Sequence, residues 1–214
     1  MNKFSWPLLA LALTACNDAN QGRTVTAKAP EPPDLSERTP SPHQLSLFHC
    51  NSTTLVLEVE GGQARLYLDG QAQQVSPVAG GFGNDTLRFT LNAEGGQLST
   101  PEGQDSCQRD LSATPWDLAR NRGVEFRALG NEPGWSLEIG AKGLLLSTDY
   151  GQRTLSGKTE PYQDGAITYY KAELFEVALS PGPCSDDMSG EEFDTQVQVR
   201  LDGQVLRGCG NSLK

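Results

Sequence analysis

The chain has 214 residues, of which 27 are acidic and 17 are Lys or Arg, so its formal net charge at pH 7 is -10. This charge excludes nucleic acid as a partner, because binding to polyphosphate needs clustered Lys and Arg side chains and the sequence has no such cluster. A cationic partner would instead be attracted over long range.

The N-terminal residues have the pattern of a bacterial secretion signal. Lys3 gives a positive charge, Phe4 to Leu13 form an apolar run, and two small residues precede Cys16. The run is too short to span a bilayer, which needs ~20 apolar residues. Its ending, Leu13-Thr-Ala-Cys16, resembles a bacterial lipobox, which implies cleavage after a signal peptide of residues 1–15 and lipid on Cys16. The alternative is an ordinary secretory signal that contains a cysteine by chance.

Residues 16–44 are predicted to be a disordered linker that begins at the lipidated cysteine. The stretch is polar, has almost no large apolar residue, and contains Pro30, Pro32, Pro33, Pro40 and Pro42. We therefore expect a lipid-anchored protein of the bacterial envelope that faces the periplasm and contacts the membrane through its N-terminal lipid. Asn17, rather than Asp, follows Cys16, which favours the outer membrane over the inner one.

Residues 45–112 are predicted to form a first domain, a small antiparallel β-sheet or barrel. Leu55, Leu57 and Val59 alternate with the residues between them, as in a half-buried strand. Gly61-Gly62 and Asp69-Gly70 are turn signals. The expected strands are 45–50, 55–60, 64–69 and 86–91.

Residues 113–123 are predicted to connect this domain to a second β-rich domain, 124–214. Thr114 can cap a brief helix that begins at Pro115 and runs to residue 122. The strands expected in the second domain are 124–129, 135–139, 144–147, 166–171, 175–179, 197–201 and 204–207. A further helical turn is expected at 189–195, with Ser189 as its cap.

The other cysteines, Cys50, Cys107, Cys184 and Cys209, are even in number and are expected in an oxidising compartment, which indicates two disulfides. Four cysteines allow three pairings. Cys50 with Cys107 and Cys184 with Cys209 is favoured, because each pair lies in one predicted domain. A zinc site is the rival interpretation, but the chain has no Cys-x-x-Cys and only two histidines, so no metal is predicted.

No catalytic constellation is apparent, so we predict that the protein is not an enzyme and needs no cofactor. The sequence contains no nucleophile motif, phosphate-binding glycine loop or metalloprotease helix. Acidic residues are densest at 186–194, where a solvated loop is favoured over a calcium site because the spacing does not match an EF-hand. An enzyme that uses the acidic cluster around Asp187 is the least favoured alternative.

In the first domain, Phe48-His-Cys50, the segment Ala64-Arg-Leu-Tyr-Leu-Asp-Gly70 and a closing Cys107 resemble the membrane-bound inhibitors of c-type lysozyme. The resemblance implies an eight-stranded β-barrel stapled by the corresponding disulfide, and a cationic c-type lysozyme as partner. Inhibitory members insert a Ser-Gly-x-x-Tyr loop, together with a later segment that carries Lys and Gly, into the lysozyme cleft. The corresponding residues here are Val78, Ala79, Gly80, Gly81 and Phe82, with Asn92 in the later segment; the Ser, Tyr and Lys are absent.

In the second domain, Phe126-Arg-Ala-Leu-Gly-Asn-Glu-Pro-Gly-Trp135, Cys184-Ser-Asp-Asp-Met-Ser-Gly190 and Gly208-Cys209-Gly210 resemble an uncharacterised domain of proteobacterial envelope proteins. The resemblance implies no activity. A turn at residues 131–133 is expected to present Trp135, which we expect in the core, and Met188 is expected to pack around the disulfide. The alternative is a ligand site formed by Glu132, Trp135, Asp186, Asp187 and Met188.

The sequence thus predicts a mainly β protein with two small antiparallel domains, the first a barrel, each with one disulfide, on a disordered lipidated tether. We expect a non-enzymatic envelope lipoprotein that binds or inhibits c-type lysozyme through its first domain. The alternative is a structural or assembly factor that binds another envelope protein or a ligand through its C-terminal domain.

Overall fold

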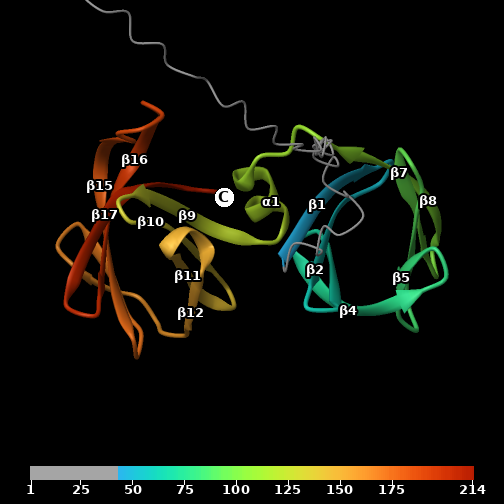
Figure 1. Ribbon diagram of the computed structural model, residues 1–214, viewed down its shortest axis with the longest axis horizontal. Coiled ribbons are helices and arrows are strands. Elements are labelled where there is room, and N and C mark those ends of the chain that lie inside the picture. The colour runs from blue at the N-terminus through green and yellow to red at the C-terminus, as the bar shows by residue number, and fades with distance from the viewer. Residues whose placement is uncertain (1–42) are drawn as a thin grey trace, which may run out of the picture. The chain divides into compact units, whose positions relative to one another are not determined.

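The computed structural model describes residues 43–214, which form a β-barrel, one short helix and a second sheet (Figure 1). These three parts belong to one compact unit. The predicted signal peptide, the lipid site at Cys16 and most of the predicted linker lie outside the described residues. The first strand begins at His43, two residues before the predicted start of the first domain at residue 45.

Eight antiparallel strands close into the barrel, each paired with its neighbours in chain order and the last paired with the first. Their inward side chains form one core in which the rings of Phe48 and Phe89 meet edge to face. The strands are β1 (His43–Cys50), β2 (Thr54–Glu60), β3 (Gln63–Leu68), β4 (Gln71–Val78), β5 (Gly81–Gly83), β6 (Arg88–Leu91), β7 (Gly95–Thr100) and β8 (Gly103–Asp110).

The first disulfide closes the barrel where its first and last strands meet. Cys50 on β1 is directly opposite Cys107 on β8, and the two form a disulfide. On the neighbouring β7, a Cβ atom at Gly95 would lie 2.0 Å from the carbonyl oxygen of Cys107, so only glycine fits there. The predicted barrel and the predicted Cys50–Cys107 pairing are both confirmed.

Helix α1 (Pro115–Asn121) follows the barrel as the sequence predicts. Thr114 caps it, and Thr114 and Asp117 each accept a hydrogen bond from the other's backbone N–H, which makes a capping box. Leu118 packs on Leu47, Val56 and Tyr67, which are buried in a small cluster separate from the main barrel core. Because the helix packs on this cluster, β1, β2 and β3 bury side chains that lie outside the main barrel core.

The second sheet has nine antiparallel strands in the order β12-β11-β10-β9-β17-β16-β15-β14-β13. The strands are β9 (Val124–Asn131), β10 (Gly134–Gly140), β11 (Gly143–Thr148), β12 (Arg153–Gly157), β13 (Tyr162–Asp164), β14 (Ile167–Lys171), β15 (Phe175–Ser185), β16 (Glu192–Leu201) and β17 (Gln204–Ser212). A 3-10 turn, η2 (Asp149–Gly151), joins β11 to β12. The predicted second antiparallel β domain is therefore confirmed.

One face of this sheet encloses a single core. Leu146 on β11 and Val177 on β15 belong to the same buried cluster, although four strands lie between theirs in the sheet. A Cβ atom at Gly157 on β12 would clash with Ala172 just before β15, so the two ends of the sheet approach each other. The sheet must therefore curl around its core, which leaves its other face outward.

The predicted helical turn at 189–195 is wrong, because β16 begins at Glu192. Phe193, Val197, Val199 and Leu201 are buried while the residues between Val197 and Leu201 are exposed, a period of two that suits a strand. Pairing with β15 on one side and β17 on the other overrides the local helix-start signal. Ser189 does not cap a helix.

Candidate functional site

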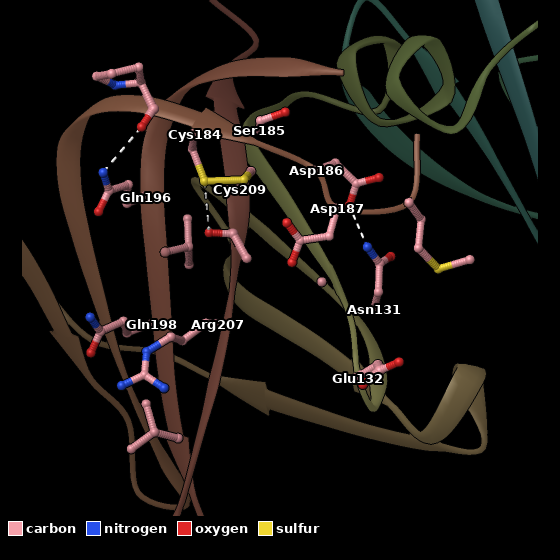
Figure 2. A pocket seen from close by; sticks show the side chains of 16 residues that line it. Asn131, Glu132, Cys184, Ser185, Asp186, Asp187, Gln196, Gln198, Arg207 and Cys209 are labelled. Carbon is pink, nitrogen blue, oxygen red and sulfur yellow. Dashed lines mark hydrogen bonds between the residues drawn. A yellow bond between two sulfur atoms is a disulfide. The ribbon is translucent and has the colours of Figure 1, made fainter. Parts of the chain in front are cut away.

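The outer face of the second sheet carries a pocket of about 600 Å³, which we call the sheet pocket (Figure 2). It lies where the end of β15 and the following loop meet β16, β17 and the end of β9. Its charged side chains are those of Glu132, Asp186, Asp187 and Arg207, and its amide side chains are those of Asn131, Gln196 and Gln198. The full lining is Gly130, Asn131, Glu132, Pro183, Cys184, Ser185, Asp186, Asp187, Met188, Gln196, Val197, Gln198, Val205, Arg207, Gly208 and Cys209.

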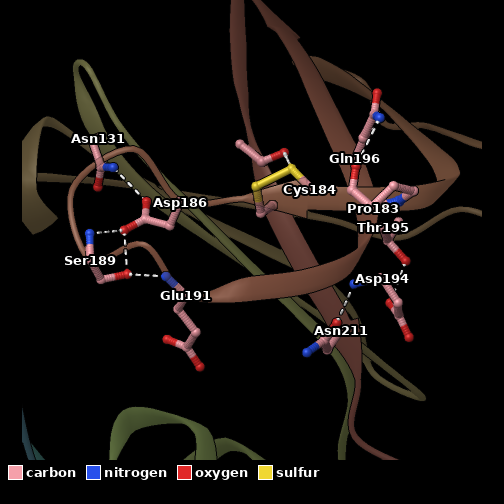
Figure 3. The surroundings of a disulfide bond; sticks show 12 residues. Asn131, Pro183, Cys184, Asp186, Ser189, Glu191, Asp194, Thr195, Gln196 and Asn211 are labelled. Carbon is pink, nitrogen blue, oxygen red and sulfur yellow. Dashed lines mark hydrogen bonds between the residues drawn. A yellow bond between two sulfur atoms is a disulfide. The ribbon is translucent and has the colours of Figure 1, made fainter.

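Asp186 organises the loop that forms one wall of the sheet pocket. Its carboxylate accepts hydrogen bonds from the backbone N–H of Ser189 at 2.8 Å, from the Ser189 hydroxyl at 2.6 Å and from the side-chain amide of Asn131 (Figure 3). Its backbone N–H donates to the carbonyl of Glu191 at 2.9 Å. The hydrogen bonds from Ser189, with help from Asn131, hold the pKa of Asp186 below its usual range. Asp186 is therefore committed to the fold of the loop.

The loop held by Asp186 leaves the next two residues exposed. Asp187 lines the sheet pocket and has no hydrogen bond or ion pair to another residue in the part of the chain that is described. Met188 is 80% exposed, so the expectation that it packs around the disulfide is wrong. The turn through residues 186–190 points its side chain outward, because the Asp186 and Ser189 bonds fix the loop from the inside. Met188 also lines the pocket.

Trp135 lies beneath the pocket and does not line it. Its side chain is 5% exposed and belongs to the core on the inner face of the sheet, as the sequence predicts. A Cβ atom at Gly130 or at Gly208 would come within 2.7 Å of the Trp135 ring, so these two glycines let the indole lie directly under the backbone of the pocket. The predicted ligand set thus divides into four residues that line the pocket and one that supports its floor.

The second disulfide borders the same pocket. Cys184 near the end of β15 is joined to Cys209 on β17, which confirms the predicted pairing (Figure 3). Gln196, on the strand between them, donates its side-chain amide to the carbonyl of Pro183 at 3.1 Å. The disulfide and this hydrogen bond together fix the end of β15 against the sheet.

Among the lining residues that sequence reasoning missed are three polar ones on strands: Gln196, Gln198 and Arg207. They are exposed residues of alternating strands, a pattern shared with any solvated sheet face. Only the register brings them together, since Gln198 on β16 is directly opposite Arg207 on β17. These residues were missed because the sequence does not show which strand pairs with which.

The barrel residues that the resemblance names also come together, at one end of the barrel. The turn at Ala79 and Gly80 joins β4 to β5, and Gly81 is paired with Thr90 on β6. Arg88 donates to the carbonyl of Ala79 at 2.8 Å, and the backbone N–H of Leu91 donates to the carbonyl of Gly80 at 2.8 Å. We call residues 78–82 and 90–92 the barrel tip.

The barrel tip exposes apolar side chains. Val78 and Leu91 are each 38% exposed. Phe82, in contrast, packs against the barrel core. The side-chain oxygen of Asn92 accepts hydrogen bonds from the backbone N–H groups of Glu94 and Gly95, so only its amide hydrogens remain free for a partner.

Within residues 43–214, no three His, Cys, Asp or Glu side chains are grouped as ligands for a metal ion. No helix in the same range combines the length and the apolar character needed to cross a bilayer. No known protein family, curated protein or solved structure matches the chain. The chemistry of the sheet pocket is therefore inferred from its own side chains.

Proposed function

We propose that the protein is a lipid-anchored protein of the bacterial envelope that binds a cationic c-type lysozyme through its barrel tip. The observation that carries this proposal is the pairing of Val78–Phe82 with the strand that leads to Asn92. The resemblance implies that these two segments act together on lysozyme, and they lie side by side on one end of a closed barrel. The proposed lipid anchor and envelope location rest on the resemblance of Leu13–Cys16 to a lipobox.

Charge favours this partner. The barrel carries eight acidic side chains and three arginines, and the whole chain has a net charge of -10. A cationic protein would be drawn to such a surface, which accelerates encounter more than it tightens the complex. The tip itself then provides apolar contact through Val78 and Leu91.

Binding is expected to be weaker than in inhibitors that carry the Ser, Tyr and Lys of the family motif. A hydrogen bond to a charged group contributes roughly 1.5–3 kcal/mol. Each missing bond therefore lowers affinity by roughly ten- to a hundredfold. The remaining interactions are apolar contact and the amide hydrogens of Asn92.

Binding of a c-type lysozyme to the immobilised full chain, measured by surface plasmon resonance, tests this proposal. Replacing both Val78 and Leu91 by Ser is expected to weaken binding at least about tenfold, because two apolar side chains lose their contact with lysozyme. The matched control replaces Leu145 and Val205, which are 40% and 42% exposed on the second sheet. Equal affinity of the tip variant and the control would overturn the proposal.

A second candidate function is ligand binding by the C-terminal sheet, favoured by the sheet pocket. Its volume is in the usual range for small-molecule sites. Crosslinking from position 187 in cells tests it: a single dominant product would support a site there, and crosslinking no stronger than from exposed Asp164 would contradict it.

A further inference from the structure

The outer face of the second sheet presents one continuous row of side chains across five strands. Tyr162 on β13 is opposite Tyr169 on β14, Tyr169 is opposite Ala178 on β15, Ala178 is opposite Gln198 on β16, and Gln198 is opposite Arg207 on β17. Residues directly opposite in antiparallel strands point to the same face. The row therefore runs from an aromatic pair at one end to a guanidinium at the other.

The row is hollowed in two places that share one residue. The sheet pocket lies over Gln198 and Arg207 (Figure 2). A smaller hollow of about 80 Å³ lies between Tyr169 and Gln198, with Ala178 and Ser180 among its walls. Small side chains on β15 thus leave a slot beside the Tyr169 ring, and we call this hollow the tyrosine slot.

The tyrosine ring that borders the slot is fixed. The rings of Tyr162 and Tyr169 are stacked, with centroids 5.2 Å apart and planes inclined by 13°. The Tyr162 hydroxyl donates to Glu176 at 3.3 Å, and Arg200 lies 3.5 Å from the same carboxylate. Glu176 already has these two partners, so the slot offers a ligand mainly the Tyr169 ring, the Gln198 amide and the Ser180 hydroxyl.

Several polar side chains along the two hollows make no hydrogen bond or ion pair among residues 43–214. The charged and amide groups among them are the Gln198 amide, the Arg207 guanidinium and the carboxylates of Asp187 and Glu132. An amide offers a donor and an acceptor in one plane, a guanidinium offers donors and a carboxylate offers acceptors. The set can satisfy a ligand that carries donors and acceptors at every position.

The mixture of charges in the sheet pocket disfavours simpler ligands. A phosphate or other anion would meet Asp187 and Glu132, and an organic cation would meet Arg207. A wholly apolar ligand would bury these polar groups without hydrogen bonds, which is costly. A sugar chain fits, because each hydroxyl both donates and accepts and the C–H face of the ring can lie against a tyrosine.

We propose that the sheet pocket and the tyrosine slot together form a binding groove for a neutral oligosaccharide. Tyr169 contacts the face of one sugar ring, Gln198 bonds to hydroxyls at the junction of the two hollows, and Arg207 and Asp187 bond to the next unit. Three strand spacings separate β14 from β17, about 14 Å, which suits several sugar units and not one. This inference rests on the second candidate function and is independent of lysozyme binding.

The test uses the full chain purified in detergent and the N-acetylglucosamine tetramer as probe, with affinity measured by titration calorimetry and contact by saturation-transfer NMR. Gln198→Ala is expected to weaken binding about tenfold, since it removes hydrogen bonds in both hollows. Tyr169→Ala is expected to weaken it at least fivefold, and Tyr169→Phe, which keeps the ring, less than twofold. Gln104→Ala, an exposed barrel position, is the control and should bind as the parent does.

The urea midpoint of each variant is measured alongside, so that loss of binding is separated from loss of fold. No saturation transfer to the tetramer at millimolar concentration would overturn the proposal, as would unchanged affinity in both Gln198→Ala and Tyr169→Ala. Crosslinking of another molecule from position 187 without oligosaccharide binding would contradict an oligosaccharide ligand. It would still support the second candidate function, ligand binding by the C-terminal sheet.

Discussion

Glu58 is a buried carboxylate on β2 that is held by three side chains. Arg65 Nη1 lies 2.8 Å from one of its oxygens, the Tyr67 hydroxyl donates to the same oxygen at 2.9 Å, and His43 Nε2 lies 2.9 Å from the other. Burial alone would raise the pKa of Glu58, but the hydrogen bonds with His43, Tyr67 and Arg65 outweigh it and lower the pKa below its ordinary value of 4.5. The ionised form therefore stabilises the barrel.

Because the pKa of Glu58 is lower in the folded chain than in the unfolded chain, its contribution is complete above about pH 4.5 and is lost as pH falls through the folded value. Glu58→Gln is expected to lower the free energy of unfolding by about 2 kcal/mol at pH 7, and by less below pH 4. Urea unfolding at both pH values measures this. Exposed Glu60→Gln is the control, and a pH-independent gap would contradict the account.

Asp186 and Asp187 are adjacent carboxylates with different roles. Asp186→Ala removes the acceptor for Ser189 and Asn131 and is expected to cost about 2 kcal/mol of stability. Asp187→Ala removes no internal bond and is expected to change stability by less than about 0.5 kcal/mol. Chemical denaturation of both variants measures the change in the free energy of unfolding. Equal changes would contradict different roles for the two carboxylates.

At the scale of elements, the contact between β17 and β9 depends on a glycine. A Cβ atom at Gly208 would lie 1.9 Å from the carbonyl oxygen of Leu129 and 2.7 Å from the Trp135 ring. Gly208→Ala must therefore move backbone and is expected to destabilise the sheet by about 3 kcal/mol. Gly165→Ala, which meets no atom but has a φ of +61°, is expected to cost only about 1 kcal/mol. Melting temperatures of the two variants measure this, and the Gly208→Ala variant is expected to melt at the lower temperature.

Sequence patterns predicted the strands whose residues alternate clearly and missed those that do not. β2 was predicted from Leu55 and Leu57, although Val56 and Glu58 beside them are buried as well. In contrast, β4 buries only Val75 and has a polar sequence, and β7 begins with two glycines. These strands exist because neighbours on both sides supply hydrogen bonds and because glycine permits close approach. Barrel closure is a property of all eight strands together.

The site was predicted to the extent that its residues are close in sequence. Glu132 was predicted to lie in a turn, and the segment 186–188 was predicted to lie in a solvated acidic loop. Gln198 and Arg207 were not, because their shared position follows from strand register, which a period of two leaves undetermined. Trp135 was placed correctly in the core, since its strand alternates.

At the scale of the molecule, each β region contains one disulfide. The cysteines are separated by 57 and 25 residues, so chain entropy predicts stabilisation of about 4 and about 3.5 kcal/mol. Replacing either pair by Ser is expected to lower the free energy of unfolding by about these amounts. Urea unfolding of the two double variants measures this, and an effect below about 1 kcal/mol for both would contradict a stabilising role.

The proposed lysozyme complex involves only one end of the barrel, so binding should leave most of the molecule unchanged. Hydrogen–deuterium exchange of the full chain, with and without saturating c-type lysozyme, tests this most directly. We expect slowed exchange in peptides that cover residues 76–94, and no change in the loop at residues 183–191. Unchanged exchange at 76–94 under saturating lysozyme, or protection confined to 183–191, would contradict binding through the barrel tip.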